Sequence, residues 1–156
     1  DSTRLIGDAS ANAPQGLADY LTAANWDTAS TLTRNELIDL KTAIKTANAN
    51  LGTMRFIANS VTCGEAEKTP IDVGSGRFLM EGDSAVGVNV LESNQAADYQ
   101  VFAGVFSQFL VGFWSGLDIK VDEATYADSD GHVIRVFQDM DFQIRHLGAF
   151  ALIENA

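Results

Sequence analysis

The sequence of 156 residues contains little cysteine and few basic residues. Cys63 is its only cysteine, so the chain can form neither an internal disulfide nor a cysteine-based metal cage. Ten Lys and Arg residues stand against 21 acidic residues, and the formal net charge is −11. The basic residues are scattered singly, whereas a nucleic-acid binder clusters them against phosphates. The composition therefore argues against binding to nucleic acid and to anionic membrane surfaces.

The beginning of the chain has no basic segment followed by an apolar run, so we expect no signal peptide. It starts with Asp1 rather than Met, and we expect a processed or truncated product that lacks upstream elements. The length fits one domain with a real core. We expect a single unit over residues 1–156, with a glycine-rich lead-in loop over 1–30, a helix and short strands over 31–100, and a β-rich part over 101–156.

One amphipathic helix is predicted between Thr33 and Ala49. Its apolar residues recur every three or four positions, at Leu37, Leu40, Ile44 and Ala47. Thr33 and Glu36 match the capping-box pattern at the start of a helix. Gly52 is the expected stop.

Short strands are predicted after this helix, over residues 54–61 and in the segments "GRFLME" and "AVGVNVLE". Between them a short helix is expected, with Asn59, Ser60 and Thr62 as candidate caps and Pro70 as its breaker. The order of loop, helix and then mostly strands predicts an α+β fold.

Residues 99–117 carry no charge and are long enough to cross a membrane. Polar residues such as Ser107 and Gln108 interrupt the run, and its aromatic and β-branched residues favour strands. We therefore expect two core strands joined near Ser107-Gln108. Bulges or close backbone approaches are expected at three glycines of this stretch: Gly104, Gly112 and Gly116.

The acidic segment from Asp122 to His132 invites comparison with a calcium-binding loop. An EF-hand aligned on Gly131 needs oxygen ligands where Tyr126 and Phe137 stand, so the pattern fails. Asp130-Gly131 between two strand-like runs predicts a hairpin turn instead. We expect no metal, no cofactor and no catalytic residues.

A different class of function would use Cys63 as nucleophile with His132 or His146 as base. That alternative is a small soluble hydrolase or ligand-binding domain. No Gly-x-Ser-x-Gly elbow accompanies these residues. The segment "GSGR" at 74–77 lacks the Lys-Ser/Thr of a phosphate-binding loop.

The C-terminal third has an ordered pattern of glycines, aromatics and charged residues. Its positions are Gly104, Phe106-Ser107, Gly112, Trp114, Gly116-Leu117, Val121-Asp122, Arg135, Gln138-Asp139-Met140-Asp141 and Arg145-His146. This order resembles the tailed-phage major capsid proteins, whose HK-ninety-seven-like fold is shared with encapsulins. Within this pattern, Val105 stands after Gly104 where the family usually has an acidic residue. Upstream, the segments "IGDASANAPQGL" and "FIANSVT" resemble the family more loosely.

The resemblance implies a mixed, mainly antiparallel sheet flanked by helices, as in the axial domain of that fold plus part of its peripheral domain. It also implies a non-enzymatic structural protein that self-assembles through pentamers and hexamers into the icosahedral shell of a tailed phage or prophage. Such a protein is made in the bacterial cytoplasm and resides in the virion capsid, with portal, scaffold or maturation protease as further partners. An encapsulin-like compartment shell is the alternative within the same fold.

Six residues are candidates for subunit contacts: Gln108, Trp114, Asp122, Glu123, Asp128 and Asp130. The alternatives are core packing for Trp114 and a solvated loop for the acids. Some members of the family cross-link their subunits, but the matching place here reads Asp130-Gly131-His132. We do not carry that chemistry over.

Overall fold

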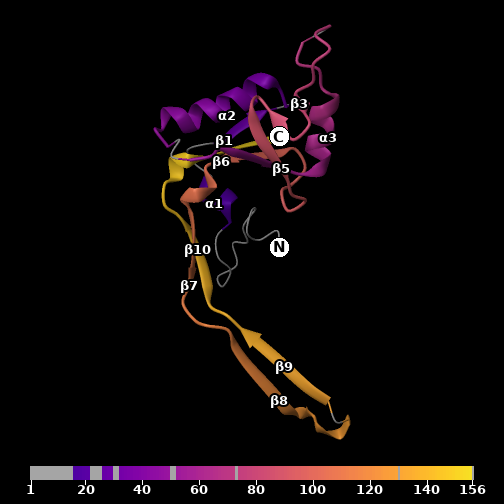
Figure 1. Ribbon diagram of the computed structural model, residues 1–156, viewed down its shortest axis with the longest axis vertical. Helices are drawn as coiled ribbons and strands as arrows, with labels where there is room; N and C mark the ends of the chain where they lie inside the picture. Colours follow the sequence, from indigo (N-terminus) through magenta and orange to yellow (C-terminus); the bar gives the residue numbers. More distant parts are fainter. Residues whose placement is uncertain are drawn as a thin grey trace. The chain divides into compact units, whose positions relative to one another are not determined.

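The computed structural model describes residues 16–21, 26–29, 32–49, 52–72, 74–129 and 131–155 (Figure 1). The chain divides into two compact units. We call residues 1–109 with 144–156 the sheet unit, and residues 110–143 the ribbon unit.

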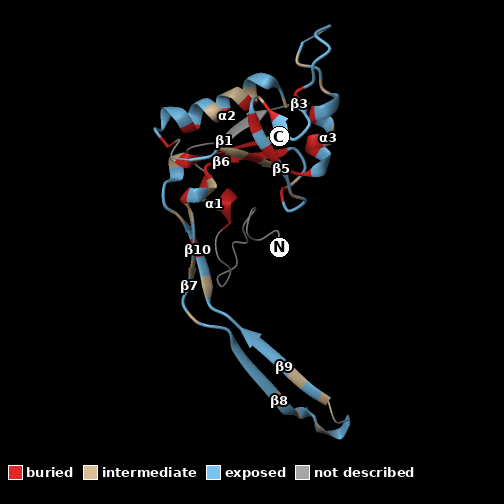
Figure 2. Ribbon diagram, viewed as in Figure 1, coloured by how far each residue is buried: buried red, intermediate tan, exposed pale blue. Residues whose placement is uncertain are grey.

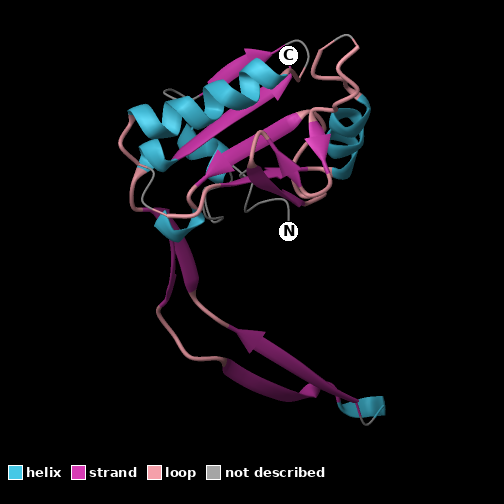
Figure 3. Cartoon of the chain, turned by 45° about the horizontal axis from the view of Figure 1, so that its top comes forward, coloured by secondary structure: helices cyan, strands magenta, loops and turns pink. Residues whose placement is uncertain are grey.

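The sheet unit is built on a seven-stranded sheet in the order β1-β11-β6-β2-β5-β4-β3. Figure 3 shows helices beside the strands of this unit. The strands are β1 (Trp26–Ala29), β2 (Arg55–Ala58), β3 (Met80–Glu81), β4 (Ser84–Ala85), β5 (Val88–Glu92), β6 (Gln100–Gly104) and β11 (Phe150–Asn155). The β1–β11 and β2–β5 pairs are parallel and the other pairs are antiparallel. The predicted mixed, mainly antiparallel α+β fold is confirmed.

Helix α2 (Arg34–Thr46) begins as its sequence predicts. The Thr33 hydroxyl accepts a hydrogen bond from the Glu36 amide at 3.4 Å, and the Glu36 carboxylate accepts one from the Thr33 amide at 2.5 Å. Three of the four predicted apolar residues are buried against β11 and β6: Leu37, Leu40 and Ile44.

The end of α2 differs from the prediction. Ala47 is the exposed C-cap residue rather than a core residue. Asn48 follows with a φ of 53°, in the left-handed region that ends many helices. Asn48 thus makes the turn that was expected of Gly52, because asparagine tolerates this conformation better than most residues.

The expected lead-in loop over residues 1–30 contains a helix, α1 (Leu17–Leu21), and strand β1. Leu17 and Leu21 are one helical turn apart and are only 2% and 1% exposed. Burying them in the core offsets the weak helix propensity of a segment rich in glycine, asparagine, aspartate and serine, because a buried leucine contributes about 2 kcal/mol. Pro14-Gln15-Gly16 in the same lead-in is a turn signal by its residue types, and it lies largely outside the described residues.

Helix α3 (Ser60–Lys68) follows β2 directly. Asn59 is its N-cap, and its side-chain oxygen accepts hydrogen bonds from the Thr62 amide at 2.8 Å and the Thr62 hydroxyl at 2.7 Å. The prediction of a capped helix at this place is confirmed. Ser60 and Thr62 lie within the helix rather than ahead of it.

The core of the sheet unit centres on β6 and β11. Every residue of β6 is buried, and Figure 2 shows the buried positions concentrated in this sheet. A Cβ atom on Gly104 would lie 2.3 Å from Cδ1 of Phe150, so this glycine permits a close approach, as predicted. Among the described residues, no helix is long and apolar enough to cross a membrane.

The strand β6 leads through a 3₁₀ turn at Phe106–Gln108 into β7 (Phe109–Phe113), so the expected connection is confirmed. The expectation that both strands belong to the core is wrong for β7. This strand pairs with β10 (Met140–Ile144) in a two-stranded sheet. Leu110, Val111 and Phe113 are about half exposed or more.

The ribbon unit contains the long pair β8 (Asp118–Tyr126) and β9 (Gly131–Phe137). We call these two strands the ribbon. They are antiparallel neighbours connected through a 3₁₀ turn at Ala127–Ser129, which confirms the hairpin, although Asp130 lies outside the described residues. Gly112 meets the ring of Trp114 as a close approach, whereas a Cβ on Gly116 would meet nothing within 4 Å. Of the bulge or close approach predicted at Gly116, the close approach is therefore wrong.

Candidate subunit-contact surface on the ribbon

The pairing register of the ribbon sorts its side chains onto two faces. Ile119 is opposite Val136, and Val121 is opposite Ile134. Because side chains two residues apart point to the same side of a strand, these four lie together. We call them the apolar face. Their exposed fractions run from 54% to 65%, and Figure 2 shows both strands exposed along most of their length.

The opposite face of the ribbon is charged. Lys120 pairs across the strands with Arg135. The Lys120 ammonium lies 3.5 Å from the Asp118 carboxylate, and the Arg135 guanidinium lies 3.3 Å from the Asp122 carboxylate. Lys120 also lies 5.7 Å from the ring centre of Phe137. These contacts neutralise part of the charge and keep this face compatible with water.

The contrast between the two faces indicates what the ribbon does. A two-stranded hairpin is marginally stable in water by itself. A row of large apolar side chains left on one face of such a hairpin marks a surface for protein contacts. The ribbon is therefore a candidate assembly surface rather than a reaction site.

This apolar face was not predicted from the sequence. The signal was present, since Ile119 and Val121 alternate with charged residues, and Ile134 and Val136 flank Arg135. The register of the two strands shows that these two alternations fall on one face.

Trp114, one of the predicted contact residues, has 72% of its surface accessible. Its backbone is fixed, because the Trp114 amide donates to the Asp139 carbonyl at 3.1 Å and the Asp139 amide donates to the Ser115 hydroxyl at 3.0 Å. Gln108, in contrast, is 9% exposed. It offers little surface to a partner.

The acidic candidates divide by their surroundings. Asp122 accepts hydrogen bonds from the amide and hydroxyl of Thr125 at 3.3 and 2.6 Å, beside an irregularity in the β8–β9 register. It thus supports the local bend. Glu123 and Asp128 are exposed, and the Glu123 carboxylate lies 4.0 Å from Nε2 of His132. Asp130 lies outside the described residues.

The alternative built on Cys63 has weak chemical support. The residue is 3% exposed, and burial, followed by the nearby carboxylates of Glu92 and Glu67, raises the pKa of its thiol to about 11. A thiol must ionise to act as a nucleophile, and this one stays protonated near neutral pH. His132 belongs to the ribbon unit, whereas Cys63 belongs to the sheet unit. The described part of the chain holds no group of three potential metal ligands.

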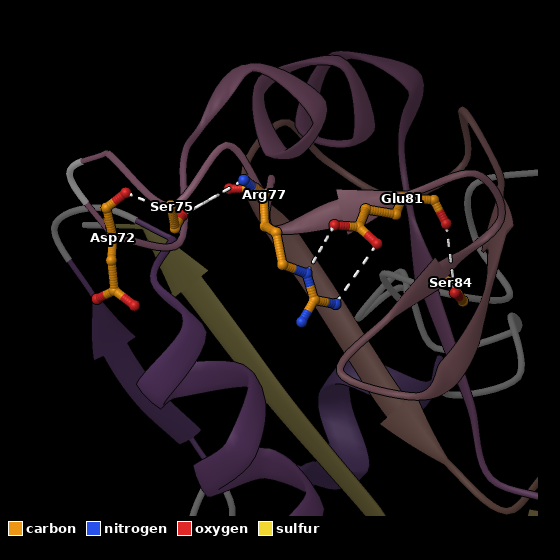
Figure 4. Close-up of polar contacts among 5 residues, drawn as sticks. All are labelled: Asp72, Ser75, Arg77, Glu81 and Ser84. Carbon is orange, nitrogen blue, oxygen red and sulfur yellow. Dashed lines mark hydrogen bonds and ion pairs between the residues drawn. The ribbon is translucent and has the colours of Figure 1, made fainter.

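The "GSGR" segment is occupied by internal contacts (Figure 4). The Arg77 guanidinium contacts the Glu81 carboxylate through Nε at 3.1 Å and Nη2 at 3.5 Å, which raises the pKa of Arg77. The Ser75 hydroxyl donates to the Asp72 carbonyl at 3.0 Å. These residues border an open cleft of about 400 Å³, in which the hydroxyls of Ser75 and Ser84 donate to backbone carbonyls rather than to a carboxylate.

Comparisons with known proteins agree with the interpretation of this chain as a structural protein. The model of the phage capsid family matches residues 1–155. A major capsid protein of Halomonas phage phiHAP-1 is 33% identical over 161 residues, which cover 97% of this chain and 25% of that protein.

Solved structures show the same fold. The capsid of a native GTA particle aligns with a TM-score of 0.74 at 18% identity, over 99% of this chain and 60% of that one. The virus-like particle from Pyrococcus furiosus aligns with a TM-score of 0.56 at 20% identity, over 83% of this chain and 56% of that one. The chain thus spans a quarter of the curated relative and a little over half of these solved chains.

Proposed function

Because the chain belongs to the phage capsid family, whose model matches residues 1–155, we propose that it forms part of a subunit of a tailed-phage or prophage shell. The subunits assemble through pentamers and hexamers into an icosahedral container for DNA. The observation that carries this proposal is the apolar face of the ribbon, four large side chains exposed in a row on one side of an antiparallel strand pair.

The proposed mechanism is geometric. Assembly covers the apolar face, which removes its side chains from water and makes an otherwise marginal hairpin stable. Trp114, Glu123 and Asp128 lie on exposed parts of the ribbon unit and are the proposed subunit contacts. Many modest interfaces then add up, because each copy in a closed shell is held by several neighbours.

The location and further partners follow from this proposal. The subunit is made in the cytoplasm of a bacterial host and ends in the virion capsid. Portal, scaffold and maturation protease are its candidate partners, and co-purification with the complete gene product tests each of them. The net charge of −11 supports weak adhesion between the shell and the DNA that it encloses.

An encapsulin-like compartment is the alternative with the same fold, because an encapsulin complex from Synechococcus elongatus also aligns with this chain, with a TM-score of 0.57 at 12% identity over 91% of this chain and 56% of that one. The relative with 33% identity is a phage major capsid protein, and it favours the phage shell. Purification of particles with their contents distinguishes the two, since a phage shell encloses DNA and a compartment encloses a protein cargo.

The decisive experiment is expression of the complete gene product, followed by size exclusion and electron microscopy. We expect closed shells or capsomer rings. Persistent monomers across varied salt, pH and protein concentration would contradict the proposal.

A further inference from the structure

The two ends of the seven-stranded sheet carry opposite charge. In the parallel pair of β2 and β5, Arg55 is the partner of Asn89 at one end, and Ala58 is the partner of Glu92 at the other. The antiparallel strands extend the second end, where Gln100 of β6 is the partner of Glu154 of β11. The strand register therefore fixes which charged residues share an end.

The first end, which we call the basic end, consists of Lys41, Lys45 and Arg55. The three side chains line one open cleft of about 500 Å³, with no carboxylate among the described residues that border it. Lys41 and Lys45 are one turn apart on α2, so they lie on the same side of that helix. No salt bridge between described residues involves any of the three.

Two of these cations are held in place. Lys41 Nζ donates to the Val86 carbonyl at 3.1 Å. With the Asn89 amide turned so that its oxygen faces Arg55, the guanidinium donates to that oxygen at 2.7 Å, and the Asn89 nitrogen donates to the Asp83 carbonyl at 2.7 Å. Lys45 is exposed. The cleft thus presents positive charge from fixed positions.

The second end, which we call the acidic end, carries four carboxylates: Glu67, Glu92, Asp98 and Glu154. Asp98 is placed by a hydrogen bond from the Asn59 side chain, directly after β2, and Glu154 accepts one from the Gln100 side chain at 2.9 Å. Glu67 and Glu92 act electrostatically on the same thiol, Cys63.

The two ends cannot neutralise each other within one copy. The four residues of β2 separate them by roughly 10 Å at about 3.3 Å per residue, whereas an ion pair needs its charged atoms within about 4 Å. Two copies can neutralise the charge of both ends, provided that the basic end of one copy faces the acidic end of the next. Contacts between two different surfaces of one subunit are those that generate closed rings.

We propose that the basic end of each copy binds the acidic end of the neighbouring copy, and that this head-to-tail contact closes the capsomer ring. The inference rests on the proposed function, because it names the surface through which copies of the subunit meet. Charge complementarity sets the direction of the contact, since two basic or two acidic ends repel each other.

The test is a charge swap in the complete gene product. The variant K45E/R55E changes the three positive charges of the basic end to a net charge of −1, so that both ends are acidic. The variant E67K/E92K/E154Q changes the four negative charges of the acidic end to a net charge of +1, so that both ends are basic. We expect each to raise the concentration needed for half-assembly by roughly tenfold or more. A variant that combines all five substitutions restores ends of opposite charge and is expected to assemble near the wild-type concentration.

The matched control is K68E/R77E, which changes the net charge as much as K45E/R55E does. Lys68 and Arg77 lie on the surface in exposed ion pairs with Glu65 and Glu81, outside the basic end. We expect this control to assemble like the wild type. Because Arg55 is partly buried, the single substitution Lys45→Glu at an exposed position repeats the test with little risk to folding.

The outcomes separate this inference from the proposed function. If the wild type forms no shell or ring, the proposed function fails. If the wild type assembles and K45E/R55E assembles at the same concentration as its control, the head-to-tail contact is wrong. It is equally wrong if the folded five-substitution variant assembles no better than its two parents. A mixture of the two parents, in contrast, is expected to assemble where neither does so alone.

Discussion

The apolar face of the ribbon yields the sharpest prediction for assembly. Val121 and Ile134 are directly opposite each other and are 56% and 65% exposed. Replacing both with threonine keeps β-branched side chains that suit a strand, but it removes apolar surface. We expect the V121T/I134T variant of the complete gene product to fold normally and to assemble poorly.

The magnitude follows from these exposures. Fully burying a valine or isoleucine contributes about 1.5–3 kcal/mol. A little more than half of each side chain remains to be covered, so covering the pair contributes about 2–3 kcal/mol by the same measure. Threonine forfeits roughly half of that, or about 1.4 kcal/mol for each subunit. This amounts to a tenfold rise in the half-assembly concentration.

Light scattering during assembly and size exclusion measure that rise, and urea unfolding of the unassembled chain measures folding. The matched control is K120T/R135T, the neighbouring cross-strand pair on the charged face. Its exposed ion pairs contribute little, so we expect assembly near the wild-type concentration. If V121T/I134T assembles as readily as this control, the apolar face is not a contact surface.

Three further predictions concern the sheet unit. Gly104→Ala forces a Cβ against Phe150 and is expected to lower the unfolding free energy by about 3 kcal/mol. Its control, Gly64→Ala, places a Cβ in open space and is expected to raise the unfolding free energy by about 0.5–1 kcal/mol. Equal urea midpoints for the two variants would contradict the close approach at Gly104. Asn59→Ala removes the cap of α3 and is expected to cost about 1–2 kcal/mol, also by urea unfolding. The Cys63 thiol, with its pKa raised from 9.0 to about 11, is expected to resist iodoacetamide at neutral pH until the chain unfolds. The thiol ionises at a lower pH in the unfolded chain than in the folded chain. The unfolding free energy is therefore expected to fall as the pH rises from 9 to 11, and to fall by more in the wild type than in the Cys63→Ala variant.

Local signals in the sequence predicted much of the sheet unit. The capping box at Thr33 and the helix start at Asn59 depend on contacts within three residues, so the sequence pattern contains all of their chemistry. The close approach at Gly104 was also predicted. Its partner, Phe150, lies 46 positions later in the chain and could not be identified from a local pattern.

The misses share one physical cause, which is contact between distant segments. Leu17 and Leu21 lie in a helix because their side chains are buried in the core, although the composition of the surrounding segment favours a loop. The strand β7 has an apolar sequence like that of β6, yet β6 is buried between neighbouring strands and β7 pairs with β10. Hydrophobicity alone does not distinguish a core strand from one whose apolar side chains are left for a partner.

The candidate contact surface shows the same limit. Trp114, Glu123 and Asp128 were selected from the sequence and lie exposed in the ribbon unit, whereas Gln108 is buried. The apolar face emerges only once the register places Val121 opposite Ile134. A shift of one residue in that register would have scattered these side chains over both faces.

The most direct measurement of the central claim is electron microscopy of the complete gene product after assembly in solution, with V121T/I134T imaged beside it at the same concentration. The account predicts closed shells or capsomer rings for the wild type and mainly unassembled subunits for the variant. Unassembled wild-type protein in every condition, or equal numbers of shells in both samples, would contradict it.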